Sequence, residues 1–383
     1  MADDVSLVLP PLLSPACNST PPRIRIRHPG YKECRGENIL LELPAIDYIV
    51  ESSSQVRTSG LHHGTAIIAC GIIANNAFDD VYFSHDPYGQ TRVRIPRDNI
   101  LEPGDYWLQL TGREPPPPTT CSPSPELIST PKDDKYYKYP IVPSFRDWQF
   151  PHGQLPDEWQ RPHSPPQPAL AKTYEVADRC FLTDLRIGLE KCHLIPSAQQ
   201  EWFNENEMSL YCNISTDSTI DDEANMVSLM ANIRVAFDNC SFVIVPKPSA
   251  ADPRLYAFAA HILSTTPEAR DFADLYQNVS IQTKYINALS PEFLFARFAW
   301  ALFPYLQKFV FESTVSRNLA VIEKNEANPR NKWMNSRRYK KRRIARGEST
   351  PGLKDYNWEK NDRGRSRHRD MWSESNTDVD VDQ

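Results

Sequence analysis

The sequence predicts an α+β protein in which two folded regions are separated by a proline-rich segment. Short runs of alternating polar and apolar residues recur in the first third of the chain, as in half-buried strands. Helix-length apolar runs and further strand-like runs follow residue 173. The chain has 34 prolines against 13 glycines, and much of the proline lies between Pro115 and Pro168. Such a stretch favours extended coil over packed elements.

These observations divide the chain into five parts. The parts are a disordered leader at 1–22, a β-rich N-terminal domain at 23–112, a Pro-rich linker at 113–172, a domain of strands and helices with a helical extension at 173–325, and a charged, disordered tail at 326–383. We expect the linker to act as a spacer, and a partner-binding role for its proline run remains open.

The composition excludes several classes of protein. Hydrophobic residues make up 40% of the 383 residues and charged residues 24%, as is ordinary for a folded soluble protein. These counts exclude a collagen, a coiled coil and a small disulfide scaffold. The formal net charge of -6 argues against a protein that coats nucleic acid through its overall charge.

The eight cysteines are scattered and form no C-x-x-C pair, which argues against a zinc finger or a thioredoxin-like site. Residues 1–4 lack the basic start of a signal peptide, and the apolar stretch that follows is broken by Pro10 and Pro11. We therefore expect a nuclear or cytoplasmic protein that is not secreted, with reduced thiols.

The N-terminal region carries the clearest strand pattern. Residues 23–27 (RIRIR) alternate polar and apolar side chains. The run at 65–74 (TAIIACGIIA) is apolar throughout and fits either a buried strand or a buried helix. Further strands are predicted at 39–43, 81–83, 91–95 and 106–110, with a turn at 86–89.

The C-terminal region mixes strands and helices. Strands are predicted at 180–183, 191–195 and 242–245, and helices at 197–208 and 223–237. A long helix begins with Ser290 as its N-cap and Pro291 at its first position, and it kinks at Pro304 on its way towards Val321. Its apolar run at 293–310 is interrupted by charged and polar residues, so we predict a helix buried on the 173–280 core and no membrane contact.

Positive charge is concentrated between residues 329 and 347, where no acidic residue occurs. One interpretation is a nuclear-import or nucleic-acid-binding patch, and the other is a solvated tail. The residues of this basic patch are Arg337, Arg338, Lys340, Lys341, Arg342 and Arg343.

An ordered series of short motifs lies between residues 180 and 247. Taken alone, its strand histidine, His193, is more often a buried, hydrogen-bonded residue than a catalytic one. The motifs are Cys180 with Thr183, His193-Leu194-Ile195-Pro196, Glu201-Trp202-Phe203, Asn225, Phe237-Asp238 and Pro246-Lys247. In this order they resemble the HNH endonuclease domain of a large group of fungal proteins. Phrases at 28–31, 61–65 and 290–300 also resemble the regions around that domain, so the resemblance covers roughly 23–112 and 173–315.

The resemblance implies a fold of two strands and a helix around one divalent metal, and metal-dependent hydrolysis of phosphodiesters in nucleic acid. His193 would be the general base, because an imidazole can accept a proton near neutral pH. Asn225 would hold the loop and orient that histidine, and a plain turn or N-cap role is equally compatible with its position. The implied cofactor is Mg²⁺ or Zn²⁺, and the implied partner is nucleic acid, DNA in particular.

The sequence departs from the family pattern at the metal. The family's last histidine, a metal ligand, falls at Arg234, and a guanidinium has no lone pair for a metal. Arg234 and Asp238 are four residues apart and share a helix face, which favours an ion pair. Cys192 precedes His193 where many such enzymes have a carboxylate, and a thiolate suits soft metals better than Mg²⁺.

Two functions therefore remain open. In the first, Asp238 and a nearby group such as Glu190 still hold a metal, and the protein is an HNH-type endonuclease. In the second, Arg234 occupies the metal position, binds phosphate instead, and the chain is an inactive nuclease-fold protein that serves as a nucleic-acid-binding or regulatory module. The second is favoured because the metal supplies the central electrostatic stabilisation in such a reaction.

Overall fold

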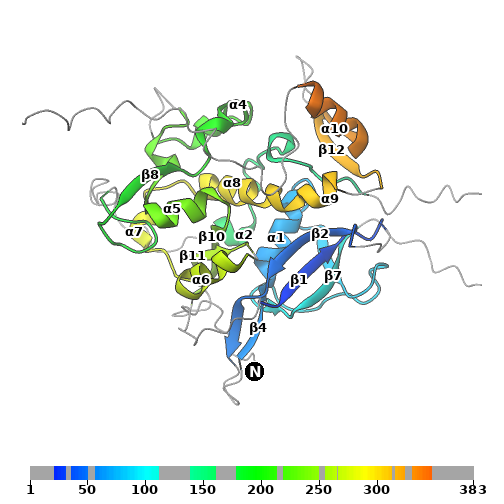
Figure 1. Cartoon of the computed structure of the whole chain (residues 1–383), viewed down its shortest axis with the longest axis horizontal. Coiled ribbons are helices and arrows are strands. Elements are labelled where there is room, and N and C mark those ends of the chain that lie inside the picture. The colour runs from blue at the N-terminus through cyan, green and yellow to red at the C-terminus, as the bar shows by residue number, and fades with distance from the viewer. Residues whose placement is uncertain are drawn as a thin grey trace, which may run out of the picture.

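The computed structural model describes residues 21–31, 36–50, 57–111, 139–160, 178–213, 219–249, 255–264, 266–312, 315–323 and 330–346. It is a mixed helix-and-sheet protein with several small sheets, as the sequence predicts. The N-terminal strands, in blue, lie on one side of Figure 1, and the segment with the HNH-like motifs, in green, lies on the other. A yellow helix runs between them.

A four-stranded sheet forms the N-terminal part of the molecule. Its order is β2 (Ile39–Pro44), β1 (Arg23–Arg27), β7 (Gly104–Leu110) and β5 (Val81–Ser84). Strand β1 pairs antiparallel with β2 and parallel with β7. Ile24 and Ile26 are fully buried, whereas Arg25 lies on the polar face and pairs with Glu42. The alternation predicted at 23–27 is confirmed over residues 23–26, whereas Arg27, on the polar face, is also buried.

The apolar run after residue 62 forms a helix, α1 (His63–Ile73), and each of its residues is buried. It begins at His62, whose imidazole accepts a hydrogen bond from the backbone N–H of Thr65. Helix α1 packs against β5 and α8 (Pro291–Leu302) and needs no polar face. A small sheet precedes it, formed by β3 (Asp47–Val50), β4 (Arg57–His62) and β6 (Ile100–Leu101).

The strand predicted at 91–95 is wrong. Only an isolated bridge forms there, between Arg92 and Ser84. The carboxylate of Asp86 accepts hydrogen bonds from the backbone N–H groups of Tyr88 and Thr91. These bonds fold the chain into the predicted turn, in which Gly89 has a φ of 74°. Because the N–H of Thr91 is bonded to Asp86, it cannot pair with a neighbouring strand.

Part of the predicted linker belongs to the core instead. Within 139–160 the chain forms a 3₁₀ turn, η2 (Phe145–Asp147), and a short helix, α2 (Asp157–Gln160). Trp148 and Trp159 are almost fully buried there. The ring of Trp159 lies 4.9 Å from that of Phe295 on α8. These tryptophans bury enough apolar surface to order a Pro-rich segment. The rest of the predicted linker lies outside the described residues.

Two strands and a helix follow in the segment with the HNH-like motifs. They are β8 (Leu189–His193), β9 (Met226–Met230) and α5 (Ala231–Asp238). The helix predicted at 223–237 is therefore wrong in its first half, because 226–230 pairs with β8 as a strand. The predicted strand at 180–183 is a turn. The predicted helix at 197–208 is present as η3 (Ser197–Gln199), α4 (Gln200–Glu205) and the start of η4 (Met208–Tyr211).

The core behind this segment is a buried hairpin covered by α8. Strand β10 (Phe242–Pro248) is buried along its whole length and pairs with β11 (Tyr256–Ile262). Helix α8 packs on β10 and also on α1, so it contacts both halves of the chain. Helices α6 (Pro267–Tyr276) and α7 (Thr283–Ile286) precede it. No helix in the described part of the chain has the length and apolar character needed to cross a membrane.

The long helix predicted from residue 290 towards residue 321 is shorter than expected. After α8 the chain continues as η6 (Phe303–Leu306), which contains Pro304, and as α9 (Gln307–Phe311). The α-helical pattern is interrupted at Pro304, because proline cannot donate a helical hydrogen bond, and the predicted kink there stays a prediction. The following segment is a hairpin of β12 (Asn318–Glu323) and β13 (Arg330–Asn335).

The disorder predicted for the tail is wrong for residues 330–346. Helix α10 (Ser336–Ala345) begins with Asn335, whose side chain accepts a hydrogen bond from the backbone N–H of Arg338. Tyr339 is buried and donates a hydrogen bond to Asp147 over 2.6 Å. The apolar and polar contacts of Tyr339 outweigh the mutual repulsion of the basic residues around it.

A buried polar cluster joins the N-terminal half to the C-terminal half. The ammonium of Lys247 on β10 donates to Asp47 on β3 over 2.6 Å and contacts His261 on β11 at 3.0 Å. The side chains of these residues are at most 1% exposed. Gln277 also donates to Asp47 over 2.6 Å. Burial alone would raise the pKa of Asp47, but the charge of Lys247 lowers that pKa well below its ordinary value.

Loss of one partner in this cluster leaves a buried charge without compensation. We expect Asp47→Ala to lower the free energy of unfolding by about 3–5 kcal/mol, because Lys247 would stay buried. The measurement is urea denaturation of the full chain, followed by tryptophan fluorescence. In the double variant Asp47→Leu with Lys247→Met, most of the loss should be recovered. Equal destabilisation by the single and double variants would contradict the role of the charge pair.

Candidate functional site

The candidate site is built on the antiparallel pair of β8 and β9 and on α5, which follows β9 directly. His193 at the end of β8 lies opposite Met226 at the start of β9. Successive residues of a strand project to opposite faces, so Glu190 and Cys192 share one face, and Lys191 and His193 share the other. Helix α5 packs on both strands.

Asn225 fastens the two ends of this unit together. Its buried side-chain oxygen accepts from the backbone N–H of Ile195 over 2.9 Å, and its amide donates to the carbonyls of Ile220 and Ile195 over 2.7 and 3.2 Å. Its backbone carbonyl accepts from Leu194 over 2.8 Å. Asn225 lies in a 3₁₀ turn, η5 (Glu223–Asn225), before a strand, not at the N-cap of a helix. It therefore holds in place the segment that directly follows His193.

His193 is partly exposed, with 22% of its side chain accessible, and its Nε2 lies 2.7 Å from the carboxylate of Asp221. A carboxylate in this position restrains the orientation of the ring. Sequence analysis did not identify Asp221, because an acidic residue in a polar loop carries no distinctive spacing. The only sequence signal is its position four residues before Asn225.

Arg234 lies between the two carboxylates that the sequence offered as metal ligands. Its Nη1 donates to Glu190 over 2.9 Å, and its Nε donates to Asp238 over 3.3 Å. The pair with Asp238 follows from the spacing of four residues on α5. The bond to Glu190 connects α5 to β8 across 44 residues of sequence and was not predicted. The guanidinium thus joins the two carboxylates that the sequence analysis offered as metal ligands.

Cys192, which precedes the strand histidine, is a buried thiol. Burial, with a contribution from the negative charge of Asp238, raises the pKa of the Cys192 thiol to about 12. The thiol is therefore protonated at neutral pH, and metals bind the thiolate. Its Sγ lies 3.6 Å from the carbonyl oxygen of Val227, to which it donates.

These residues do not fit a divalent metal. A guanidinium bonds both carboxylates and brings its own positive charge, which repels a second cation. Among the described residues, no group of three or more His, Cys, Asp or Glu side chains is arranged to hold a metal ion. The arrangement keeps a positioned imidazole beside a guanidinium that is already bonded to two carboxylates.

A second arginine supports the site from behind. Arg297 on α8 is 2% exposed, and its guanidinium donates to the carbonyl oxygens of Leu194 and Phe237. It also lies 3.6 Å from the centre of the Phe237 ring. Leu194 follows the strand histidine, and Phe237 lies in the last turn of α5, so Arg297 fixes the distance between strand and helix. Sequence analysis took this residue only as an interruption of an apolar run.

The basic patch lies on a different part of the molecule. Helix α10 and the unit of β8 and α5 are at opposite sides of Figure 1. Arg337, Arg338, Lys340 and Lys341 are exposed on α10, whereas Arg342 and Arg343 are partly buried. The ring of Phe311 lies 5.5 Å from the guanidinium of Arg343. The helix therefore presents four cations to solvent as an ordered surface.

Comparison with known proteins identifies the segment that contains the candidate site. Residues 176–245 match a family model described as HNH endonuclease. The match begins before the turn at 180–183, includes β8, β9 and α5, and ends within β10. No curated protein and no solved structure matches the chain. The resemblance found in the motifs is thus confirmed for this segment, and the expected fungal origin stays a prediction.

Removal of the Asn225 side chain should loosen the site. We expect Asn225→Ala to lower the free energy of unfolding by about 3 kcal/mol, because buried backbone groups of Ile195 and Ile220 would lose their partners. Urea denaturation measures this change. The control is Asn232→Ala on the exposed face of α5, which should change the stability by less than about 0.5 kcal/mol. Similar values for the two variants would contradict the role given to Asn225.

Proposed function

We propose that this protein binds nucleic acid through an HNH-type fold and does not hydrolyse it. The observation that carries the proposal is the position of Arg234, whose guanidinium bonds both Glu190 and Asp238. In a ββα nuclease the metal stabilises the charge on the phosphate and on the leaving oxygen. A fixed guanidinium can attract the phosphate but cannot coordinate and activate a leaving oxygen in this way.

Nucleic acid is the proposed partner because the fold match and the surface charge agree. The segment at 176–245 matches a family that acts on phosphodiesters, which supports a polynucleotide ligand, DNA in particular. Four exposed cations on α10 can contact phosphates. Binding to a polyanion is compatible with a net charge of -6, because such contacts depend on local and not overall charge. We also propose α10 as a nuclear-import signal and a nuclear location for the protein.

A second candidate is an active HNH endonuclease, and one observation favours it. The pair of His193 and Asp221, at 2.7 Å, provides a positioned general base, and Asn225 holds the adjoining segment. In this alternative, Arg234 would turn away when a metal binds to Asp238 and Glu190. The ion pairs of Arg234 oppose that movement, which is why we prefer the binding function.

The two candidate functions predict different results when the purified full chain is incubated with plasmid DNA. We expect no nicking above background with Mg²⁺, Mn²⁺ or Zn²⁺, and no difference between the wild type and His193→Ala. Arg234→His removes the blocking cation and adds an imidazole that can bind metal. This variant should cleave at least about 100-fold faster than the wild type, since an electrostatic group of this kind contributes 10²–10³ in rate.

The decisive control is the double variant Arg234→His with His193→Ala, which should be inactive if cleavage uses the proposed base. Metal-dependent nicking by the wild-type protein that disappears in His193→Ala would overturn the binding proposal and establish the endonuclease.

Helix α10 should contribute phosphate contacts to binding. We expect the combined replacement of Arg337, Arg338, Lys340 and Lys341 by Gln to reduce the slope of log K against log salt by up to about 3–4, since each contact contributes about 0.9. Fluorescence anisotropy with a labelled duplex at several salt concentrations measures the slope. The control replaces Arg94 and Arg186, which are exposed in loops, by Gln. An equal slope in the α10 variant and the wild type would exclude α10 from the interface.

A further inference from the structure

The exposed face of α10 carries positive charge that no carboxylate of the described residues balances. The four exposed cations of this face are Arg337, Arg338, Lys340 and Lys341. None of them forms an ion pair with another described residue. Beneath the helix, the carboxylate of Asp147 accepts a hydrogen bond from Tyr339. Its charge acts on Arg342 and Arg346, which lie further along the helix.

The positions of these cations are unfavourable for the helix itself. Arg337 and Arg338 lie in the first turn of α10, where the helix dipole is positive and no acidic residue is present. Arg337 and Lys341 are four residues apart on one helix face, so their like charges repel each other. Carboxylates that contact this face would therefore lower the electrostatic free energy of the helix.

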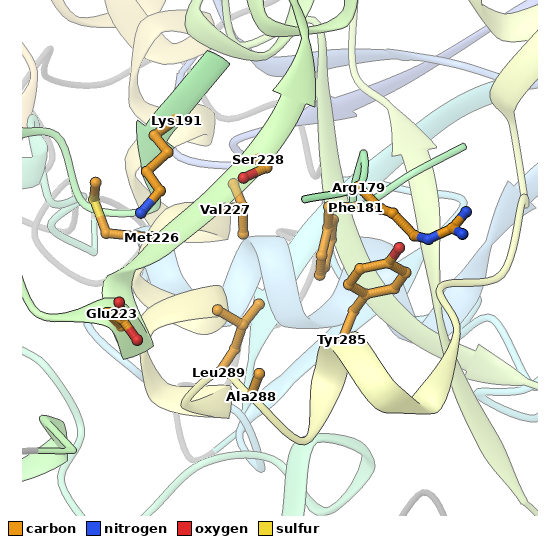
Figure 2. Close-up of a pocket in the computed structure, with 10 residues that line it drawn as sticks. All are labelled: Arg179, Phe181, Lys191, Glu223, Met226, Val227, Ser228, Tyr285, Ala288 and Leu289. Atoms are coloured by element: carbon orange, nitrogen blue, oxygen red, sulfur yellow. The ribbon is translucent and has the colours of Figure 1, made fainter. Parts of the chain in front are cut away.

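The cations around the small pocket next to β8 and β9 (Figure 2) already have carboxylates beside them. Arg179, in this pocket, pairs with Asp184 at 3.5 Å. Figure 2 shows Lys191 on the same side of the pocket as the carboxylate of Glu223. An acidic segment would gain less there than on α10, because the carboxylates already present would repel it.

The sequence after α10 contains an acidic run with regular spacing, at 378–382 (DVDVD), outside the described residues. Asp378, Asp380 and Asp382 alternate with valines, and residues 370–383 contain no Lys or Arg. In an extended conformation, alternate side chains project from one face about 6.7 Å apart. Residues four apart on a helix, such as Arg337 and Lys341, are separated by about 6 Å along its axis. The spacing of the carboxylates thus matches that of the cations.

The acidic run is close enough along the chain to reach α10. Residues 347–377 separate the two, and an extended chain of this length spans up to about 100 Å. Helix α10 is only about 15 Å long. A segment of the same chain is also present at a high effective concentration, of the order of millimolar for a short flexible connection.

We propose that the acidic run at 378–382 docks on the exposed face of α10 and competes there with the phosphates of nucleic acid. The inference rests on the proposed function and adds a regulation of the same surface. A docked run occupies the cations that phosphates would otherwise contact, so nucleic acid must displace it in order to bind. The competition weakens at high salt, because exposed ion pairs are screened.

The first test removes the three carboxylates of the acidic run from the full chain. The variant carries Asp378→Asn, Asp380→Asn and Asp382→Asn. The matched control carries Asp355→Asn, Glu359→Gln and Asp362→Asn, and it changes the net charge by the same amount. Fluorescence anisotropy with a labelled duplex, at about 50 mM and about 300 mM salt, measures the affinity of each protein.

We expect the acidic-run variant to bind the duplex about 3- to 100-fold more tightly than the wild type at the lower salt concentration, because each exposed ion pair contributes a factor of about 1.5 to 5. The control should stay within about twofold of the wild type. When the four exposed cations of α10 are replaced by Gln, the same three substitutions should change the affinity by less than about twofold. Equal tightening in the acidic-run variant and the control would overturn the docking, because it would show an effect of overall charge.

The second test detects the contact in the absence of nucleic acid. A carbodiimide joins a carboxylate directly to an amine that touches it, and the amines on this face are Lys340 and Lys341. Peptide mass spectrometry of the cross-linked full chain should find links between residues 378–382 and these two lysines. Absence of such links would overturn the docking and leave the proposed function intact. Links in a protein that does not bind the duplex would overturn the proposed function and the competition, but would retain the contact.

Discussion

The guanidinium of Arg234 lies between the carboxylates of Glu190 and Asp238, and through these bonds it connects α5 to β8. Helix and strand meet at this point in the ββα unit, and the resemblance to the HNH domain predicts the metal position there. The guanidinium offsets part of the repulsion between two carboxylates in a partly buried position and leaves a net charge of minus one on the three groups. The charge that holds the two elements together is therefore part of the chain itself.

The rest of the structure keeps this unit rigid. Arg297 fixes the end of β8 relative to α5, and Asn225 fastens the loop beside the strand histidine. Behind them, the buried pair of Lys247 and Asp47 ties the hairpin of β10 and β11 to the small sheet of β3, β4 and β6. The N-terminal half is therefore part of the same packed core as the segment that matches the nuclease family.

The sequence pattern predicted the structure correctly where neighbouring residues determine it. The alternation at 23–27 gave a strand, the spacing of Arg234 and Asp238 gave an ion pair, and the ordered motifs gave the HNH-type segment. The sequence pattern predicted the wrong element at 226–230. Five mostly apolar residues fit a strand as well as a buried helix, and only the pairing with β8 decides between them.

Other features depend on contacts that sequence spacing does not reveal. The segment at 139–160 was expected to be a spacer because of its prolines, yet Trp148 and Trp159 fill gaps left by distant elements. The basic residues of α10 suggested disorder, and a single buried tyrosine, Tyr339, anchors the helix to Asp147. Asp221 and Glu190 acquire their roles only through partners 28 and 44 residues away.

The central claim is that Arg234 takes the place of a metal. The most direct measurement is isothermal titration calorimetry of the full chain with Mn²⁺ and Zn²⁺, repeated with Asp238→Asn. The account predicts that the wild type and the variant show the same weak, unsaturated heats. A single one-to-one site in the wild type that is lost in Asp238→Asn would contradict it.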